Sequence, residues 1–176
     1  MKSYVLMVVT LMASVNVRAE CQIFASQQKV TWNTISAAER QQAKGQAISL
    51  PEKQIQVQVV CGEPHRIRLF PGSNGQQSGM FSLGSNGEMH ITASHARVDD
   101  KSVRIAPVQM SDETPPSAGS ETFPVTPDQG LAFMDGHEVY GKTASLTLTV
   151  LSKIKPGTLT DRTTWRGNLH IRMDIQ

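Results

Sequence analysis

The chain has 176 residues, of which 39% are hydrophobic, 18% charged and 5% aromatic, and its formal net charge is +2. This length suits a single domain. Lys2 and Arg18 lie in an N-terminal segment with the character of an export signal, and without them 15 basic residues balance 15 acidic ones. A neutral and fairly apolar mature chain excludes a strongly basic nucleic-acid binder and an acidic disordered tail, so we expect no nucleic-acid partner.

Residues 1–19 have the features of a secretory signal peptide. Lys2 supplies a positive start, and residues 4–15 form an uncharged, mostly apolar run that is too short to span a bilayer. Val17 and Ala19 are compact residues at the positions that precede a cleavage site. A buried core helix is the structural alternative, but an isolated apolar segment followed by polar sequence favours export.

Cys21 and Cys61 are the two cysteines of the chain. In an oxidising compartment an even count favours a disulfide, which here would close a loop of about 40 residues and contribute roughly 3–4 kcal/mol. Neither cysteine has further metal ligands at short spacing, and the Cys-x-x-Cys redox motif is absent. We therefore expect a structural Cys21–Cys61 disulfide in a mature domain of residues 20–176, with no metal and no other cofactor.

Most of the mature chain alternates apolar and polar residues with the period of β-strands. In chain order, the segments with this period are residues 29–35, 55–61, 66–70, 89–95, 103–105, 145–150 and 167–176. Turn-forming residues separate them, for example Asp99-Asp100. About seven short strands divided in this way indicate an all-β antiparallel sandwich rather than alternating strands and helices.

Two segments depart from the strand pattern. Ser36, followed three residues later by Glu39, is a capping-box pattern, which predicts at most a short helical turn ending at Gly45. Residues 107–130 are rich in Pro, Ser, Thr and acidic residues and lack a clear period. We expect a long connection there, of the kind that is functional or mobile in a compact domain.

The histidines and serines show no catalytic motif. His90 and His95 are an odd number of residues apart on one expected strand, so they should face opposite sides and not bind one ion together. A nucleophile-elbow glycine pattern surrounds none of the serines. The sequence therefore indicates no enzyme, and a secreted hydrolase assembled from distant residues is kept as a remote alternative.

The densest polar cluster is Asp135-Gly136-His137-Glu138, with Asp128 nearby in sequence. It could offer carboxylate oxygens and an imidazole to a cation. Asp-Gly is also the favoured dipeptide of a tight turn between two strands. We favour a hairpin tip over a metal site.

Several short segments resemble the fimbrial (pilus) subunits of chaperone–usher systems. They are Cys21 with residues 30–32, then residues 57–64, 67–69, 81–87, 157–159 and 167–175. In that family one cysteine lies on the first strand and its partner at the end of the second. The resemblance implies an immunoglobulin-like sandwich that lacks one strand and has an apolar groove beside its C-terminal strand. A periplasmic chaperone fills this groove during export, and a strand of a neighbouring subunit fills it in the fibre.

The resemblance also implies which residues line the groove, namely Leu169, Ile171, Met173 and Ile175. Their spacing suits the core strand of a complete sandwich equally well. The chain departs from the family in two ways: Cys21 would be the second mature residue, which leaves no N-terminal donor strand, and Ile175 replaces the usual penultimate aromatic. We therefore expect a chain that accepts a strand but does not give one, as in a tip or terminal subunit or a fimbrial-like protein that does not polymerise.

The resulting hypothesis is a non-catalytic fimbrial-like subunit that is exported through the periplasm to the cell surface. Its expected partners are a periplasmic chaperone, an outer-membrane usher and neighbouring pilus subunits. Adhesion to a host receptor would use the loops, chiefly residues 107–130. The alternative is a self-complete periplasmic or secreted β-sandwich that binds a ligand or protein without joining a fibre.

Overall fold

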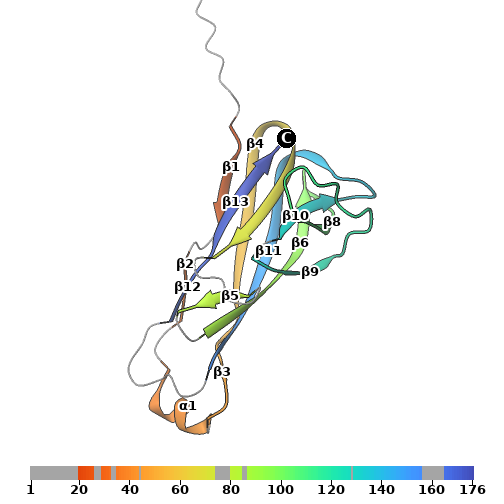
Figure 1. The fold of residues 1–176 in the computed structure, drawn as a ribbon. Coiled ribbons are helices and arrows are strands. Elements are labelled where there is room, and N and C mark those ends of the chain that lie inside the picture. Colours follow the sequence, from red (N-terminus) through yellow and green to blue (C-terminus); the bar gives the residue numbers. More distant parts are fainter. Residues whose placement is uncertain are drawn as a thin grey trace, which may run out of the picture.

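The computed structural model describes residues 20–25, 29–32, 35–43, 45–73, 80–84, 87–127, 129–155 and 165–176. The expected signal segment, residues 1–19, lies outside the described residues, as do Asp128 and residues 157–159. In the described part, strands dominate and all of their pairings are antiparallel (Figure 1). The predicted all-β, antiparallel sandwich-like fold is confirmed.

The described elements follow one another as a series of strands interrupted by one short helix. They are β1 (Gln22–Ala25), β2 (Lys29–Trp32), α1 (Ala37–Gln42), β3 (Ile48–Ser49), β4 (Lys53–Gly72), β5 (Phe81–Leu83), β6 (Gly87–Val98), β7 (Lys101–Ser102), β8 (Arg104–Val108), β9 (Thr122–Val125), β10 (Gly130–Met134), β11 (Tyr140–Ile154), β12 (Trp165–Asn168) and β13 (His170–Ile175).

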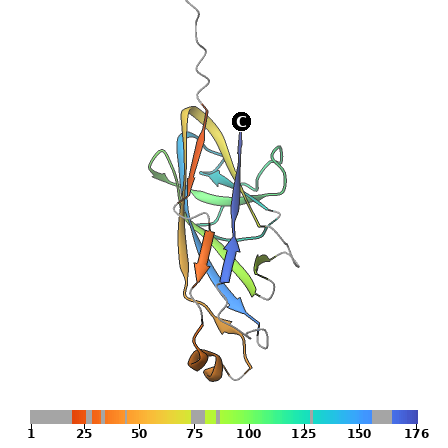
Figure 2. The same ribbon diagram turned by 90° about the vertical axis from the view of Figure 1, so that its left-hand side faces the viewer.

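Strand β4 belongs to both layers of the fold. Its first half pairs with β1 on one side and β11 on the other, and β11 continues the layer to β6. Its second half pairs with β13 and β10, and β10 pairs with β8. Figures 1 and 2 show β4 turning over at the end of the molecule where the C-terminus lies. The two layers are therefore joined through one continuous strand.

The inner faces of the two layers form the main core. Alternate residues of β4, Ile55, Val57 and Val59, are buried against the interior while the residues between them are exposed. Strand β11 alternates in the same way, with Leu146, Leu148 and Val150 buried. The period-two pattern of these segments arises because one face meets the core and the other meets water.

The second half of β4 is buried on both faces. Ile67 and Leu69 point into the main core, as their alternation predicts, but Arg68 and Phe70 between them are buried as well. A second apolar cluster on the outer side of this layer accounts for Phe70, together with Ala106, Val108, Ala132 and Met134. The alternation in residues 66–70 therefore predicted the strand correctly, but it did not predict that a second apolar cluster buries the outer face of this strand.

The capping box at Ser36 is present. The Ser36 hydroxyl accepts a hydrogen bond from the Glu39 backbone N–H at 3.2 Å, and the Ser36 N–H donates to the Glu39 carboxylate at 2.7 Å. Helix α1 has six residues, and Gly45 beyond it has a φ of +81°. The short helical turn is confirmed. No helix in the described part of the chain has the length and hydropathy needed to span a membrane.

Residues 107–130 are more ordered than a single long connection. Pro107 and Val108 complete β8, and β9 pairs with residues 91–94 of β6. Pro124 in the middle of β9 has no N–H to donate, so β9 can pair fully on one side only and lies at an edge. This proline and the surrounding polar residues mask the strand period in the sequence.

Candidate functional site

Strands β1 and β13 present neighbouring unpaired edges. Among the described residues, β1 pairs only with residues 57–60 of β4 and β13 only with residues 67–72. Because β4 turns over between these two stretches, β1 and β13 run in opposite directions side by side (Figures 1 and 2). The opening between the two layers therefore has a strand edge on each side.

A cleft of about 360 Å³ lies between these edges, and we call it the β1–β13 groove. Its lining comprises Ile23, Ala25, Lys29 and residues 168–171. At one end β2 pairs with β12, with Val30 opposite Gly167, so that end is closed by a short ladder. The groove is thus closed along β2 and β12 and open along β1 and β13.

The four residues expected along the groove all lie at the end of the chain, on β13 or directly before it. Leu169 is 6% exposed, and Ile171, Met173 and Ile175 are partly buried against the main core. Leu169 and Ile171 line the groove, whereas Met173 and Ile175 lie farther along β13, opposite Leu69 and Ile67 of β4.

The opposite wall was missed by the sequence analysis. Ile23 and Ala25 are partly buried, and they alternate with the exposed Gln22 and Phe24. Four residues of alternation are too few to separate a strand from irregular sequence. The signal that could have found this wall was the proximity of Cys21, since its bond to Cys61 fixes where β1 begins.

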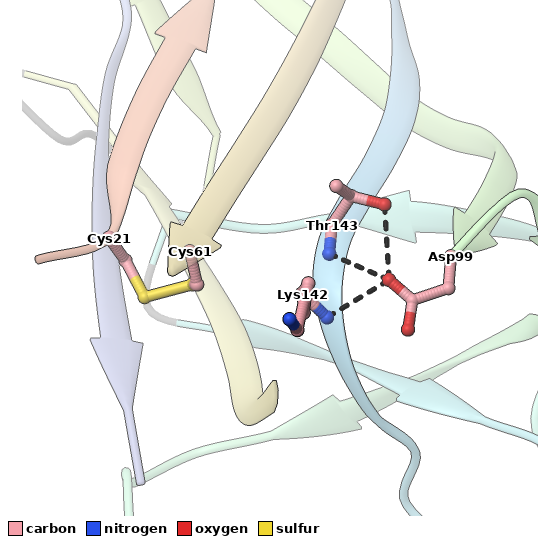
Figure 3. The surroundings of a disulfide bond; sticks show 5 residues. All are labelled: Cys21, Cys61, Asp99, Lys142 and Thr143. Carbon is pink, nitrogen blue, oxygen red and sulfur yellow. Dashed lines mark hydrogen bonds between the residues drawn. A yellow bond between two sulfur atoms is a disulfide. The ribbon is translucent and has the colours of Figure 1, made fainter. Parts of the chain in front are cut away.

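Cys21 and Cys61 form the predicted disulfide, with an S–S distance of 2.00 Å and a Cα–Cα distance of 4.1 Å (Figure 3). Cys21 immediately precedes β1, and Cys61 lies in β4. The bond anchors the start of β1 to β4. One edge of β1 is therefore held in the first layer while its other edge faces the groove.

The turn predicted at Asp99-Asp100 connects β6 to β7. Both residues have positive φ, 46° and 62°, as a two-residue hairpin turn requires. Asp99 Oδ1 also accepts hydrogen bonds from the backbone N–H groups of Lys142 and Thr143, each at 2.9 Å (Figure 3). The β4–β11 register shifts between Gly141 and Thr143, so this carboxylate binds amides at an irregular part of the ladder.

The polar cluster at Asp135 is a hairpin tip, as we favoured. The Asp135 N–H donates to the His137 carbonyl at 2.8 Å, and Gly136 has a φ of +73°. Glu138 turns back to bind Arg68 instead of facing a cation. In the described ranges, no group of three or more His, Cys, Asp or Glu side chains is placed to hold a metal ion.

The prediction that His90 and His95 face opposite sides is wrong. Both are exposed, because the alternation of β6 changes phase between Ala93 and Ala96, which are both buried. His95 has a φ of +52°, and the pairing with β11 shifts at the same level, between Ser145 and Thr147. An additional residue in β6 therefore returns His95 to the outer face.

Over 164 residues the chain is 31% identical to the uncharacterized protein YhcE of Escherichia coli (strain K12), and the alignment covers 90% of this chain and 91% of YhcE. The chain belongs to the YhcE family. No family model matches it, and no solved structure matches it. Because the alignment covers nearly the whole of both chains, the YhcE relationship applies to most of this chain and not to one segment of it.

In this YhcE-family chain, the β1–β13 groove combines backbone edges with apolar walls. Unpaired N–H and C=O groups along a strand edge are a template for another strand. The side chains of Ile23, Ala25, Leu169 and Ile171 would meet the alternate side chains of that strand. The chemistry available here is backbone hydrogen bonding and apolar burial.

Proposed function

We propose that this chain is a non-catalytic, fimbrial-like subunit that accepts a β-strand from a partner protein in the β1–β13 groove. The observation that carries the proposal is the pair of strand edges, unpaired within the described part of the chain, on either side of a largely apolar cleft. A strand inserted there would pair with β1 on one side and with β13 on the other. This mode of recognition draws affinity from main-chain hydrogen bonds and specificity from alternate side chains.

The proposed partners follow from where such a strand would come from. A periplasmic chaperone would supply it during export, and a neighbouring pilus subunit would supply it after transfer through an outer-membrane usher. The Cys21–Cys61 disulfide supports passage through an oxidising compartment such as the periplasm. At the cell surface the chain would serve as a tip or terminal subunit in adhesion.

One observation favours a different function. The pairing of β2 with β12 over four residues already closes one end of the groove without a partner. In a self-complete periplasmic or secreted sandwich, which binds a ligand or protein outside any fibre, this ladder would close the groove sufficiently and no partner strand would be needed. The two functions differ in whether the edges of β1 and β13 gain stability from an added strand.

The experiment uses the position of the C-terminus. Gln176 follows β13 at the end of the molecule where β1 begins (Figure 1). A two-residue turn and a seven-residue strand of alternating Thr and Val, beginning with Thr and fused after Gln176, would lead back along β13 as far as residue 170 and place a Val opposite Ile171 in the groove. The matched control fusion has Asp in place of each Val and keeps the same length and turn.

The proposal predicts that only the Val fusion raises the thermal unfolding midpoint and slows hydrogen exchange of the backbone amides in β1 and β13. The unfused chain should aggregate or be degraded in the periplasm unless a donor strand is present. An unfused chain that unfolds cooperatively at the same temperature as the Val fusion, with equal amide protection in β1 and β13, would contradict strand acceptance and favour the self-complete sandwich.

A further inference from the structure

The outer face of the first layer has a second opening. A cleft of about 650 Å³ crosses β1, β4, β11 and β6, and we call it the outer cleft. Phe24 of β1 lines one side, and His95 and Arg97 of β6 line the other. Between them lie Gln58 of β4 and Ser145 of β11. Ala25 borders both openings, but Phe24 lines the outer cleft and Ile23 lines the β1–β13 groove, because these two side chains alternate along β1.

Strand register places the main groups of the outer cleft in one row. Phe24 lies opposite Gln58, Gln58 lies opposite Ser145, and Ser145 lies opposite Arg97. The row therefore crosses four strands in the order aromatic ring, amide, hydroxyl and guanidinium. With neighbouring strands about 4.8 Å apart, it extends over about 14 Å. Thr147 lies in the next row and adds a second hydroxyl.

The backbone is unusual at the Arg97 end of the row. His95 has a φ of +52°, which is uncommon for a residue with a β-carbon, and its ring nitrogen Nδ1 lies 3.0 Å from the Ser94 hydroxyl. A bulge of this kind redirects a side chain, and strained residues of this kind cluster at binding sites. Here the bulge brings His95 to the outer face beside Arg97.

A larger opening adjoins the outer cleft at these same residues. It has a volume of about 730 Å³, and its lining includes Ser94 together with His95 and Arg97, which also line the outer cleft. His95 and Arg97 are therefore accessible from two sides. Arg97 also donates one N–H to the carbonyl of Asp100, which holds the guanidinium in place, and a guanidinium has five N–H groups in total.

The charge of the outer cleft is one-sided. Arg97 is the charged residue of its lining, and no carboxylate is present among the lining residues that the structure describes. The remaining groups are amides and hydroxyls, which both donate and accept hydrogen bonds. Phe24 is 52% exposed.

We propose that the outer cleft binds an acidic saccharide. The Arg97 guanidinium would pair with the carboxylate of the sugar, because arginine matches a carboxylate with two parallel hydrogen bonds. Gln58, Ser145 and Thr147 would bond to sugar hydroxyls, and the exposed ring of Phe24 would pack on the apolar face of a sugar ring. This proposal does not depend on strand acceptance, because it uses the outer side of the layer.

The test is isothermal titration calorimetry on the exported, disulfide-bonded protein with six probes. Three are acidic: trigalacturonate, a hyaluronan tetrasaccharide and sialyllactose. The other three are the carboxyl-reduced forms of the same saccharides. At least one acidic probe should bind, and its reduced form should bind at least tenfold more weakly.

Two variants locate the site. Arg97→Gln and Phe24→Ser should each weaken binding of that probe at least tenfold, while Arg97→Lys, which keeps the charge, should retain part of the affinity. The matched controls are Arg166→Gln and Tyr140→Ser, which change an exposed arginine and an exposed aromatic elsewhere and should leave binding unchanged. All variants should unfold at the parent temperature.

Four results would overturn the proposal. The first is the absence of binding by all three acidic saccharides. The second is equal affinity for the acidic saccharide that binds and its reduced form. The third is unchanged binding by Arg97→Gln. The fourth is a hexapeptide of alternating Glu and Ser that binds as tightly as the best saccharide and loses affinity in the same variants, because the cleft would then be a site for acidic peptide.

Discussion

Arg68 and Glu138 form a two-pronged ion pair, with Nε to Oε1 at 2.7 Å and Nη2 to Oε2 at 2.8 Å. Arg68 is 1% exposed, and its Nη1 donates to the carbonyls of Met110 and Ser111. The hydrogen bonds to Glu138 raise the pKa of the guanidinium above its usual value. This buried arginine therefore fastens the 135–138 hairpin tip and the start of the loop after β8 to the second layer.

Removing Glu138 should destabilise the protein more than removing the whole pair. Glu138→Ala leaves Arg68 buried without its counter-charge, at an expected cost of about 3 kcal/mol in the free energy of unfolding. The double variant Arg68→Met, Glu138→Met should lose less, because both charges are gone. Urea unfolding of the two variants measures the difference, with Asp135→Ala on the exposed hairpin tip as the control. A double variant less stable than Glu138→Ala would contradict this account.

Breaking the disulfide should release β1 first. Cys21→Ala with Cys61→Ala is expected to cost about 3–4 kcal/mol, as estimated for a loop of about 40 residues. In the described chain β1 has β4 as its one strand partner, so its amides should lose hydrogen-exchange protection before those of β11. Uniform loss of protection across both strands would show that the disulfide supports the layer as a whole. Thiol titration of the unfolded, unreduced parent should find no free cysteine.

Asp99 should matter through its hydrogen bonds as well as its turn conformation. Asp99→Ala removes an acceptor for two backbone amides and places alanine at positive φ, so we expect a loss of about 2 kcal/mol. Asp99→Asn keeps an acceptor oxygen and tolerates this φ, so its loss should be about half as large. Asp100→Ala is the control, since it changes the turn without those two bonds. Equal losses in Asp99→Ala and Asp100→Ala would assign the effect to the turn alone.

The groove wall on β13 can be tested with the fused strand. Ile171→Ser should abolish most of the stabilisation that the Val fusion provides, because Ile171 lines the β1–β13 groove and an inserted apolar side chain would contact it. Arg172→Ser, at the adjacent exposed position, should leave that stabilisation intact. The measurement is the difference in unfolding midpoint between fused and unfused chains in each background. Loss of the difference in both variants would show that the fusion acts elsewhere.

The capping box should make the stability of α1 depend on pH. Hydrogen bonds from the backbone and side chain of Ser36 lower the pKa of Glu39, so the ionised carboxylate stabilises the folded turn. That contribution is complete above the pKa of the unfolded chain and disappears as pH falls through the lower, folded pKa. NMR titration of the Glu39 carboxyl should show this pKa, and Ser36→Ala should raise it towards the usual value. An unchanged titration in Ser36→Ala would exclude the Ser36 hydroxyl as a cause and leave the Ser36 backbone N–H, which this variant keeps.

The elements that the sequence predicted are those with strong local rules. Strand β4 alternates over residues 55–61 because one face is buried, the Asp99-Asp100 turn uses residues that tolerate positive φ, and Ser36 with Glu39 caps a helix through local bonds. Each feature depends on neighbours in the chain. Local pattern was therefore sufficient to identify the all-β fold.

The features that were missed depend on distant parts of the chain. The strand period predicts that Arg68 faces outward. The loop after β8 covers it, and the Met110 carbonyl that it binds lies 42 residues away in the sequence. Pro124 interrupts the alternating pattern by which β9 could have been predicted as a strand. The bulge at His95 reverses which residues of β6 face the core, and the composition gives no signal of it. The groove wall formed by Ile23 and Ala25 likewise requires the path of β4, which no local period reveals.

Sharing β4 between the two layers has a kinetic consequence. The partners of β4 range from Gln22 to Ile175, so neither layer can be completed early from local contacts. Strand pairings at such separations form slowly. The second layer in particular requires β13, which follows the other described strands in the chain. Until β13 pairs with β4, the edges of β1 and β4 are exposed together, and the nascent protein is at its most vulnerable to aggregation.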